Sequence, residues 1–296
     1  MYAAYAPRLV NIASVGAWYK KRLIRLLLPF YWYLAVHYAL MLLFPTLFSG
    51  LGLQKSWKFI FQSITLIGGI NLNWLPLLFL QLAVLFPVLV LLQRKKNVLF
   101  WLYLCVAFFL TVFFTIWQFP YSAYRQVMWI PWSLFMVLPW YFYERERKKY
   151  SPLPYFLLSA LGATCFAFLY IVWIHLGRSV TLIDNKYPPN FFYITYEMFG
   201  SFLLVGIGLW PFLKRRMLAA IIQFISKTSY ALFFIHYIVL DFVLSVNKLW
   251  GNGISIWYQT LFVIFVSLAI AWILLQSQKR LHTFLQSHTH LYTFLL

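Results

Sequence analysis

The sequence predicts an all-α protein, a polytopic membrane helix bundle with about eight transmembrane helices and both termini in the cytoplasm. Three observations predict this class. The chain of 296 residues is 64% hydrophobic and only 10% charged, whereas roughly a quarter of the residues in a soluble domain are charged. Its apolar residues form runs that are long enough to cross the ~30 Å hydrocarbon layer of a bilayer. Its basic residues cluster between alternate runs.

Each expected transmembrane helix corresponds to an apolar run of about 20 residues. The run 59–70 is shorter and ends with Gly68 and Gly69, so we interpret it as a re-entrant or interfacial segment. No internal repeat or low-complexity linker divides the chain, and we expect residues 1–296 to form a single domain. The predicted helices cover residues 23–44, 74–93, 98–117, 126–143, 153–176, 191–212, 229–246 and 254–276.

The basic residues orient these helices. Sixteen of the 24 Lys and Arg residues lie in alternate loops, at residues 20–25, 94–96, 145–149, 214–216 and 279–280. Because cytoplasmic loops are enriched in Lys and Arg, both termini are expected in the cytoplasm, with 277–296 as an amphipathic cytoplasmic tail. The net charge of +19 belongs to these clusters, so we attribute it to topology and anionic lipid and not to nucleic acid.

Ionisable side chains inside a bilayer are costly, so each needs a physical reason. Four lie within predicted spans: His37, Glu197, His236 and Asp241. For each, the simplest reason is a hydrogen bond to a neighbouring helix, and for His37 we prefer such a structural role. Glu197 either pairs with a basic residue of the outer loops or faces a polar cavity.

Polar side chains also run along the predicted helix 229–246. Seven residues advance a helix by nearly two turns, so Ser229 and His236 share one face. Tyr230 and Asp241 lie on a second face, about a third of a turn away. Because a helix in contact with lipid alone would not carry two polar stripes, we prefer a lined cavity here over interhelical hydrogen bonding alone.

The basic segment 20–29 differs from the other basic clusters. Arg22 and Arg25 are three residues apart, so their side chains lie on one face where the helix enters the membrane. Two guanidinium groups on one face suit bidentate recognition of phosphate. On spacing alone we favour the alternative, which is simple anchoring at the cytoplasmic surface.

No metal site, disulfide or soluble-enzyme motif is indicated. The tail residues His282, His288 and His290 have no acidic or cysteine residues beside them, and Cys105 and Cys165 lie inside apolar runs. The sequence contains no glycine-rich phosphate loop and no nucleophile elbow. With so few acids, a pump that relays protons through buried carboxylates is also disfavoured.

Two segments match motifs of one known family. In residues 19–31, Arg22 and Arg25 precede Pro29 and an aromatic residue, and this run resembles the basic start of that family's third helix. In residues 225–236, a Ser-Tyr pair is followed by aromatic and aliphatic residues and then by a His, which resembles the family's late-helix signature.

A third and weaker match is Trp74, flanked by Asn73 and Leu75 and followed at a distance by Pro87, which resembles a helix that begins with Trp and ends in Pro. By these motifs the chain resembles the acyltransferase 3 family, membrane acyltransferases that modify glycans and other exported molecules. The matches occur in the family's order and cover nearly the whole chain.

The resemblance implies a transferase of the bacterial cytoplasmic (inner) membrane that takes an acyl group, commonly acetyl, from acyl-CoA. The implied acceptor is a sugar hydroxyl of a cell-envelope polysaccharide, of another exported glycan or of a lipid-linked glycan. Arg22 and Arg25 become candidates for binding the donor phosphates. Ser229, Tyr230 and His236 become candidates for the wall of the acyl-transfer cavity. No metal is implied, and nothing in the sequence indicates an oligomeric state.

One departure from the family pattern matters. The family normally has ten helices, and the first carries a basic residue followed by the catalytic His. The eight predicted spans match the last eight of ten, and Met1–Ser14 contains no His. We therefore expect an N-terminally incomplete chain that is inactive as written, for which His236 can be offered as a substitute general base.

Two other functions fit the composition. A transporter or flippase for a lipid-linked glycan would also have aromatic-rich helices and a basic cytoplasmic face, although the internal symmetry common in transporters is not visible here. A structural membrane subunit without chemistry of its own is the third interpretation.

Overall fold

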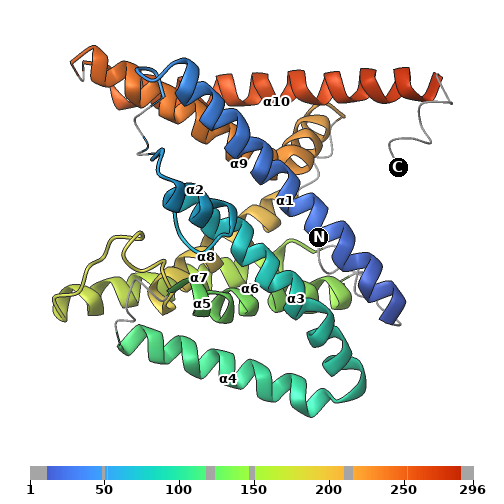
Figure 1. The fold of residues 1–296 in the computed structure, drawn as a ribbon. Coiled ribbons are helices and arrows are strands. Elements are labelled where there is room, and N and C mark those ends of the chain that lie inside the picture. Colours follow the sequence, from blue (N-terminus) through green and yellow to red (C-terminus); the bar gives the residue numbers. More distant parts are fainter. Residues whose placement is uncertain are drawn as a thin grey trace. The chain divides into compact units, whose positions relative to one another are not determined.

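The described part of the chain consists of helices joined by turns and short connections. The computed structural model describes residues 12–48, 51, 53–117, 124–146, 151–209, 216–251 and 253–287. These residues form helices and no strands, which confirms the predicted all-α class. Figure 1 traces the helices along the chain.

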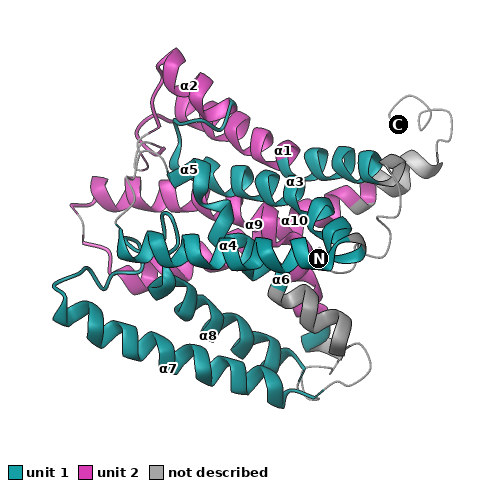
Figure 2. Ribbon diagram, turned by 90° about the horizontal axis from the view of Figure 1, so that it is seen from below, with its two compact units in different colours: residues 1–26, 65–219 teal, residues 27–64, 220–296 magenta. Residues whose placement is uncertain are grey.

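The chain divides into two compact units, which Figure 2 shows in different colours. Unit 1 comprises residues 1–26 and 65–219, and unit 2 comprises residues 27–64 and 220–296, so that α1 (Ile12–Leu43) contributes to both. Unit 1 contains η2 (Asn71–Asn73), α3 (Trp74–Lys95), α4 (Asn97–Ile116), α5 (Tyr124–Val127), α6 (Trp129–Glu146), α7 (Leu153–His175) and α8 (Phe191–Gly208). Unit 2 contains α2 (Trp57–Ile64), most of α9 (Arg216–Leu249) and α10 (Ile256–Ser287).

Large apolar side chains are exposed along the helices of both units. Phe109 of α4, Leu204 of α8 and Trp257 of α10 are 69%, 70% and 75% exposed. In water, an apolar surface of this extent would drive association, whereas hydrocarbon solvates it. This exposure, together with the helix lengths below, identifies an integral multi-pass membrane protein.

Seven helices among the described residues are long and apolar enough to cross a membrane. They correspond closely to seven of the eight predicted spans, because both the predicted spans and these helices are defined by a long run of apolar residues with few charges. These helices are Val15–Leu43, Asn71–Arg94, Asn97–Ile116, Leu153–His175, Phe191–Gly208, Leu218–Leu249 and Ile256–Gln278.

The remaining predicted span, 126–143, differs from the expectation. It forms the short α5 and then α6, which has 18 residues but ends in Glu144, Arg145 and Glu146. These charged residues leave too few apolar residues in α6 for it to be one of the seven helices. The cytoplasmic placement of both termini requires α6 to cross as an eighth span, and it stays a prediction.

Helices α7 and α8 form a tightly packed hairpin in unit 1, side by side in Figure 2. A Cβ atom at Gly162 of α7 would lie 2.8 Å from the backbone nitrogen of Phe199 in α8. The Ser159 hydroxyl donates a 2.9 Å hydrogen bond to the Phe199 carbonyl. Small residues at such an interface let two membrane helices approach closely, and here they stabilise the hairpin that carries the α7–α8 loop.

In unit 2, aromatic residues join α1 to α9. Phe30 and Tyr33 of α1 lie 5.8 Å and 5.2 Å from the ring of Phe234 in α9. The apolar run 59–70 contributes to α2, which is eight residues long and therefore too short to cross a bilayer. In the predicted tail, residues 277–287 continue α10, and residues 288–296 lie outside the described residues.

Candidate functional site

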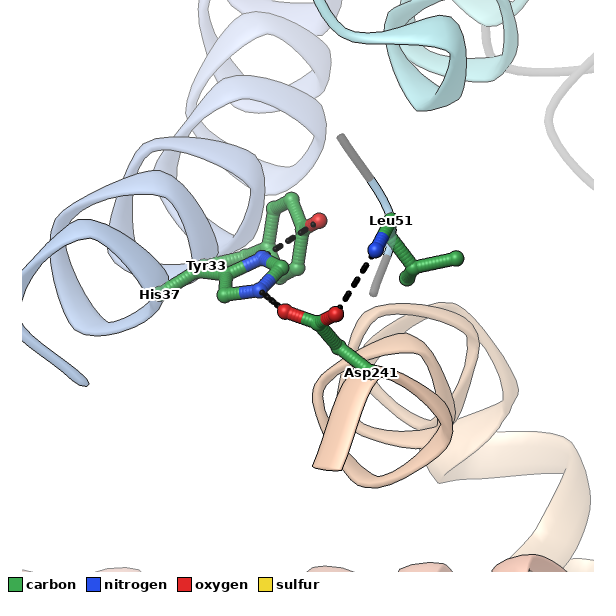
Figure 3. A network of polar contacts seen from close by, with 4 residues as sticks. All are labelled: Tyr33, His37, Leu51 and Asp241. Carbon is green, nitrogen blue, oxygen red and sulfur yellow. Dashed lines mark hydrogen bonds and ion pairs between the residues drawn. The ribbon is translucent and has the colours of Figure 1, made fainter. Parts of the chain in front are cut away.

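A buried His–Asp pair lies in unit 2 (Figure 3). His37 comes from α1 and Asp241 from α9, and the His37 Nε2 atom lies 2.7 Å from the Asp241 Oδ2 atom. The two side chains are 0% and 1% exposed. The structure thus brings together two of the four intramembrane ionisable residues that the sequence singles out, although the sequence does not indicate that they are partners.

Two further groups complete this network. The Tyr33 hydroxyl lies 2.9 Å from His37 Nδ1, and the backbone N–H of Leu51 donates a 2.8 Å hydrogen bond to Asp241 Oδ1. If Tyr33 donates to Nδ1 and the Nε2–H of His37 donates to Asp241, each donor meets an acceptor. The network therefore satisfies both ring nitrogens and both carboxylate oxygens.

This saturation limits the chemistry of the pair. A general base must reach the proton that it removes, and both nitrogens of the fully buried His37 are already bonded within the protein. The pair instead connects α1, α9 and the segment around Leu51, so we assign it a positioning role. Asp241 is 1% exposed and its two oxygens accept hydrogen bonds from His37 and Leu51, so this arrangement gives no support for its predicted place in a cavity wall.

His236 lies in the same helix as Asp241 and differs from His37. It is half-buried, and its Nδ1 lies 3.2 Å from the carbonyl oxygen of Leu232. Donation of the Nδ1 proton to that carbonyl leaves a lone pair on Nε2. Nε2 has no hydrogen-bond partner among the described residues, so this histidine retains the atom that a general base uses.

The polar residues predicted to accompany His236 occupy less enclosed positions. Ser229 is exposed, and its hydroxyl donates a 3.2 Å hydrogen bond back to the Ser226 carbonyl. Tyr230 is half-buried, and its ring packs edge-on against Phe234 at 5.0 Å. Neither of these contacts draws Ser229 or Tyr230 into the His37–Asp241 network.

The two arginines of the predicted phosphate site lie in the unit 1 part of α1. Arg22 is buried, and its guanidinium carbon lies 5.3 Å from the ring centroid of Trp18. Arg25 is exposed. The three-residue spacing predicted two equivalent guanidinium groups, whereas the structure places one beneath the surface and leaves the other accessible to a ligand.

Glu197 of α8 accepts a 2.7 Å hydrogen bond from the hydroxyl of Tyr193. Its charge also acts on Lys186 of the preceding loop, whose ammonium nitrogen lies 4.4 Å from the ring centroid of Trp74. Burial lowers the pKa of Lys186, while the negative charge of Glu197 opposes this change without overcoming it. The described contacts include no ion pair between Glu197 and a basic residue of the outer loops, so pairing with such a residue and facing a polar cavity both stay predictions.

A polar pocket in unit 1 was not foreseen from the sequence. It has a volume of about 350 Å³ and lies where α4 and α7 end and α8 begins. The sequence signal for it is the loop 177–190 between two predicted spans, which is dense in Ser, Thr, Asp and Asn and whose basic residues are predicted only as partners of Glu197. The lining residues are Phe114, Thr115, Trp173, Arg178, Ser179, Asp184, Asn185, Tyr187, Pro188 and Asn190.

Hydrogen bonds of its own side chains hold this loop. Asp184 accepts hydrogen bonds from the hydroxyls of Ser179 and Thr181, and these bonds lower the pKa of its carboxyl group, so it remains ionised near neutral pH. Arg178 donates to the carbonyls of Thr115 and Ile116 at the end of α4. The pocket therefore contains one fixed negative and one fixed positive charge.

No group of three or more His, Cys, Asp or Glu side chains that could hold a metal ion occurs among the residues that the structure describes. A protein-family model described as an acyltransferase domain matches residues 2–276 of the chain. No curated protein and no solved structure matches it.

Proposed function

Because the chain belongs to the acyltransferase 3 family, we propose that it moves an acyl group from acyl-CoA to a hydroxyl group of a cell-envelope or exported glycan. The observation that carries this proposal is the family match, which extends over residues 2–276 of a polytopic helical protein. The simplest donor is acetyl-CoA, and the proposed location is the bacterial cytoplasmic membrane.

The reaction is an acyl transfer in which atoms balance without a metal or redox partner. The acceptor hydroxyl oxygen attacks the thioester carbonyl carbon, an ester C–O bond forms, and the C–S bond breaks. A base removes the hydroxyl proton, which finally reaches the leaving coenzyme A thiolate. His236 supports the role of base in this scheme, because its Nε2 atom has no partner among the described residues.

The donor is proposed to bind at the basic end of α1. Coenzyme A carries several phosphate groups, and guanidinium groups bind phosphate through paired hydrogen bonds. Arg25 supports this role because its side chain is exposed. Arg22 is buried against Trp18 and is better suited to orienting this end of the helix than to contacting the donor directly.

The proposal is tested with the full chain in lipid nanodiscs and with cells that express it. We expect acetyl-CoA to bind, Arg25→Gln to weaken binding, and Arg94→Gln, which removes a guanidinium from another basic cluster, to leave binding unchanged. In cells given labelled acetate, the proposed role of His236 as the base predicts new O-acetyl groups on envelope glycans, an outcome that would overturn the expectation from the sequence that the chain as written is inactive. Label on glycan together with donor binding supports the proposal.

Other outcomes decide against it. Acetyl-CoA binding without any labelled glycan would contradict a glycan acceptor. Absence of acetyl-CoA binding, together with movement of a lipid-linked glycan across the nanodisc or vesicle membrane, would favour a flippase.

A further inference from the structure

The pocket of unit 1 lies at one end of three helices. It is formed where α4 and α7 end and where α8 begins, at Phe114, Trp173 and Asn190. The other ends of α4 and α7 follow basic clusters in the sequence, and a third cluster follows α8. By the positive-inside rule, those basic ends face the cytoplasm, so the pocket faces the opposite side, where an exported acceptor is found.

The frame of the pocket is rigid because one buried amide satisfies all its hydrogen bonds. Asn185 is 5% exposed. Its side-chain oxygen accepts from the Trp173 indole N–H at 3.2 Å and from the Asn190 amide at 2.6 Å. Its side-chain nitrogen donates to the carbonyls of Ser179 and Thr181 at 2.9 Å and 2.8 Å. A polar network that is satisfied in this way holds a single conformation of the loop.

Arg178 retains hydrogen-bonding capacity on the pocket wall. Its two terminal nitrogens donate to Thr115 and Ile116 at 2.6 Å and 3.0 Å, and its guanidinium carbon lies 5.3 Å from the Trp173 ring centroid. A guanidinium has five N–H donors, so three remain after these two contacts. The contacts fix its position, and the remaining donors are available to a ligand.

Asp184 retains complementary capacity. Its Oδ2 atom accepts the hydroxyls of Ser179 and Thr181, and its Oδ1 atom has no partner among the residues that the structure describes. The side chain is exposed, lines the pocket and carries a full negative charge. A carboxylate in this state accepts hydrogen bonds from hydroxyl groups.

We propose that this pocket binds a neutral, hydroxyl-rich ring of the acceptor, that is, an uncharged sugar unit. A hydroxyl group donates to Asp184 Oδ1, and a second hydroxyl accepts from the free N–H groups of Arg178. The rings of Phe114 and Tyr187 supply apolar surface for the C–H face of a sugar. A volume of about 350 Å³ falls within the range of small-molecule sites.

The pair of opposite charges gives a charged sugar no net attraction. A uronic acid that pairs with Arg178 brings a second carboxylate into the pocket that contains Asp184, and an amino sugar that pairs with Asp184 brings a second cation into the pocket that contains Arg178. A neutral ring can hydrogen-bond to both groups without this repulsion. This inference rests on the proposed function for the identity of the acceptor. It does not depend on the acyl donor, so binding of the sugar is measured without acyl-CoA.

Saturation-transfer NMR on the full chain in nanodiscs provides the first test. The probes are methyl α-glucopyranoside, methyl α-galactopyranoside and the methyl glycoside of glucuronic acid. We expect binding of at least one neutral glycoside and about tenfold weaker binding in Asp184→Asn, because the neutral amide cannot form the charge-assisted hydrogen bond to the sugar hydroxyl. Lys186→Gln, in the same loop but outside the pocket lining, is the matched control and should bind as the unmodified chain does.

Chemical protection provides a test that does not rely on Asp184→Asn folding correctly. Ser179 is exposed and lines the pocket. Ser179→Cys, in a chain with Cys105→Ala and Cys165→Ala, should react with a membrane-impermeant maleimide added from outside, and the neutral glycoside should slow this reaction. Binding of the glucuronide alone, unchanged binding in Asp184→Asn, or no protection of the thiol would overturn the inference. Failure of acetyl-CoA to bind would leave these measurements unaffected and would count only against the proposed function.

Discussion

The side chains of His37 and Asp241 meet within unit 2 although 204 residues separate them in sequence. The His37 ring nitrogen and the Asp241 carboxylate oxygen are 2.7 Å apart, and the Leu51 N–H binds the second oxygen of the same carboxylate. Three separate segments of unit 2 therefore depend on one carboxylate. In the low dielectric of a helix bundle, such a network is stable only when each of its members is present.

Asp241→Ala should strongly destabilise the protein. It leaves the His37 ring nitrogen and the Leu51 N–H without their partner in a buried site, and removal of one member of a buried pair costs about 3–5 kcal/mol. Thermal unfolding in nanodiscs, followed by circular dichroism, should show a large decrease in melting temperature. His175→Ala, which changes an exposed histidine at the end of α7, should have little effect.

The double variant His37→Leu with Asp241→Leu distinguishes the contribution of the hydrogen-bonded pair to stability from that of the volume its side chains fill. Replacement of a buried pair by apolar residues of similar volume is often close to neutral, so the double variant should be more stable than Asp241→Ala. If the double variant is the less stable of the two, the pair contributes more than the avoidance of an unpaired charge.

Lipid-facing apolar runs made most of the fold predictable. They identify the helices because a spanning helix must satisfy its backbone internally and needs about 20 apolar residues. The same reasoning placed the end of the span 126–143 before Glu144, Arg145 and Glu146, whereas the structure includes these charged residues in α6. Element ends are where local composition is least decisive.

The partners of the site residues were less predictable. Helical spacing shows which residues of one helix can share a face, and it predicted this for Arg22 and Arg25. It does not show that Arg22 is buried beside Trp18 while Arg25 is exposed. The pocket was missed for the same reason. It depends on contacts between distant segments, such as the one from Arg178 to the Thr115 carbonyl, which no local pattern encodes.

The loop of the pocket should open at low pH. The pKa of Asp184 is lowered from its ordinary value of 3.8 by hydrogen bonds from Ser179 and Thr181. A lowered folded-state pKa means that the carboxylate stabilises the loop fully above pH 3.8, and that this contribution is lost as the pH falls through the lower folded value. The loop backbone should therefore lose protection from hydrogen exchange, measured relative to the intrinsic exchange rate at each pH, as the pH falls below 3.8. Asp184→Asn should remove this pH dependence, and an unchanged profile in that variant would contradict the assignment.

Lys186 should react with amine reagents at a lower pH than an exposed lysine does. Burial lowers its pKa from 10.5, which increases the fraction of reactive neutral amine at a given pH. Competitive reductive methylation with mass spectrometry can compare it with Lys58, which is exposed. Glu197→Gln should shift the midpoint for Lys186 further down, because the carboxylate of Glu197 is the group that raises this pKa. A shift in the opposite direction would contradict the proposed influence of Glu197.

Gly162→Ala should weaken both the α7–α8 hairpin and the pocket at its end. The added Cβ would lie 2.8 Å from the backbone nitrogen of Phe199, a contact that backbone atoms cannot relieve without moving the helices apart. Overpacking of this kind costs about 1–3 kcal/mol, and thermal unfolding should record it.

Gly200→Ala is a matched control in α8, since a Cβ there meets no atom within 4 Å. The control should be neutral or slightly stabilising, because alanine favours the helix over glycine by about 1 kcal/mol. Because the hairpin holds Trp173 and Asn190 at the pocket, Gly162→Ala should also weaken binding of the neutral glycoside. Equal effects of Gly162→Ala and Gly200→Ala on thermal unfolding would show that helix propensity, and not close approach of the helices, governs this interface.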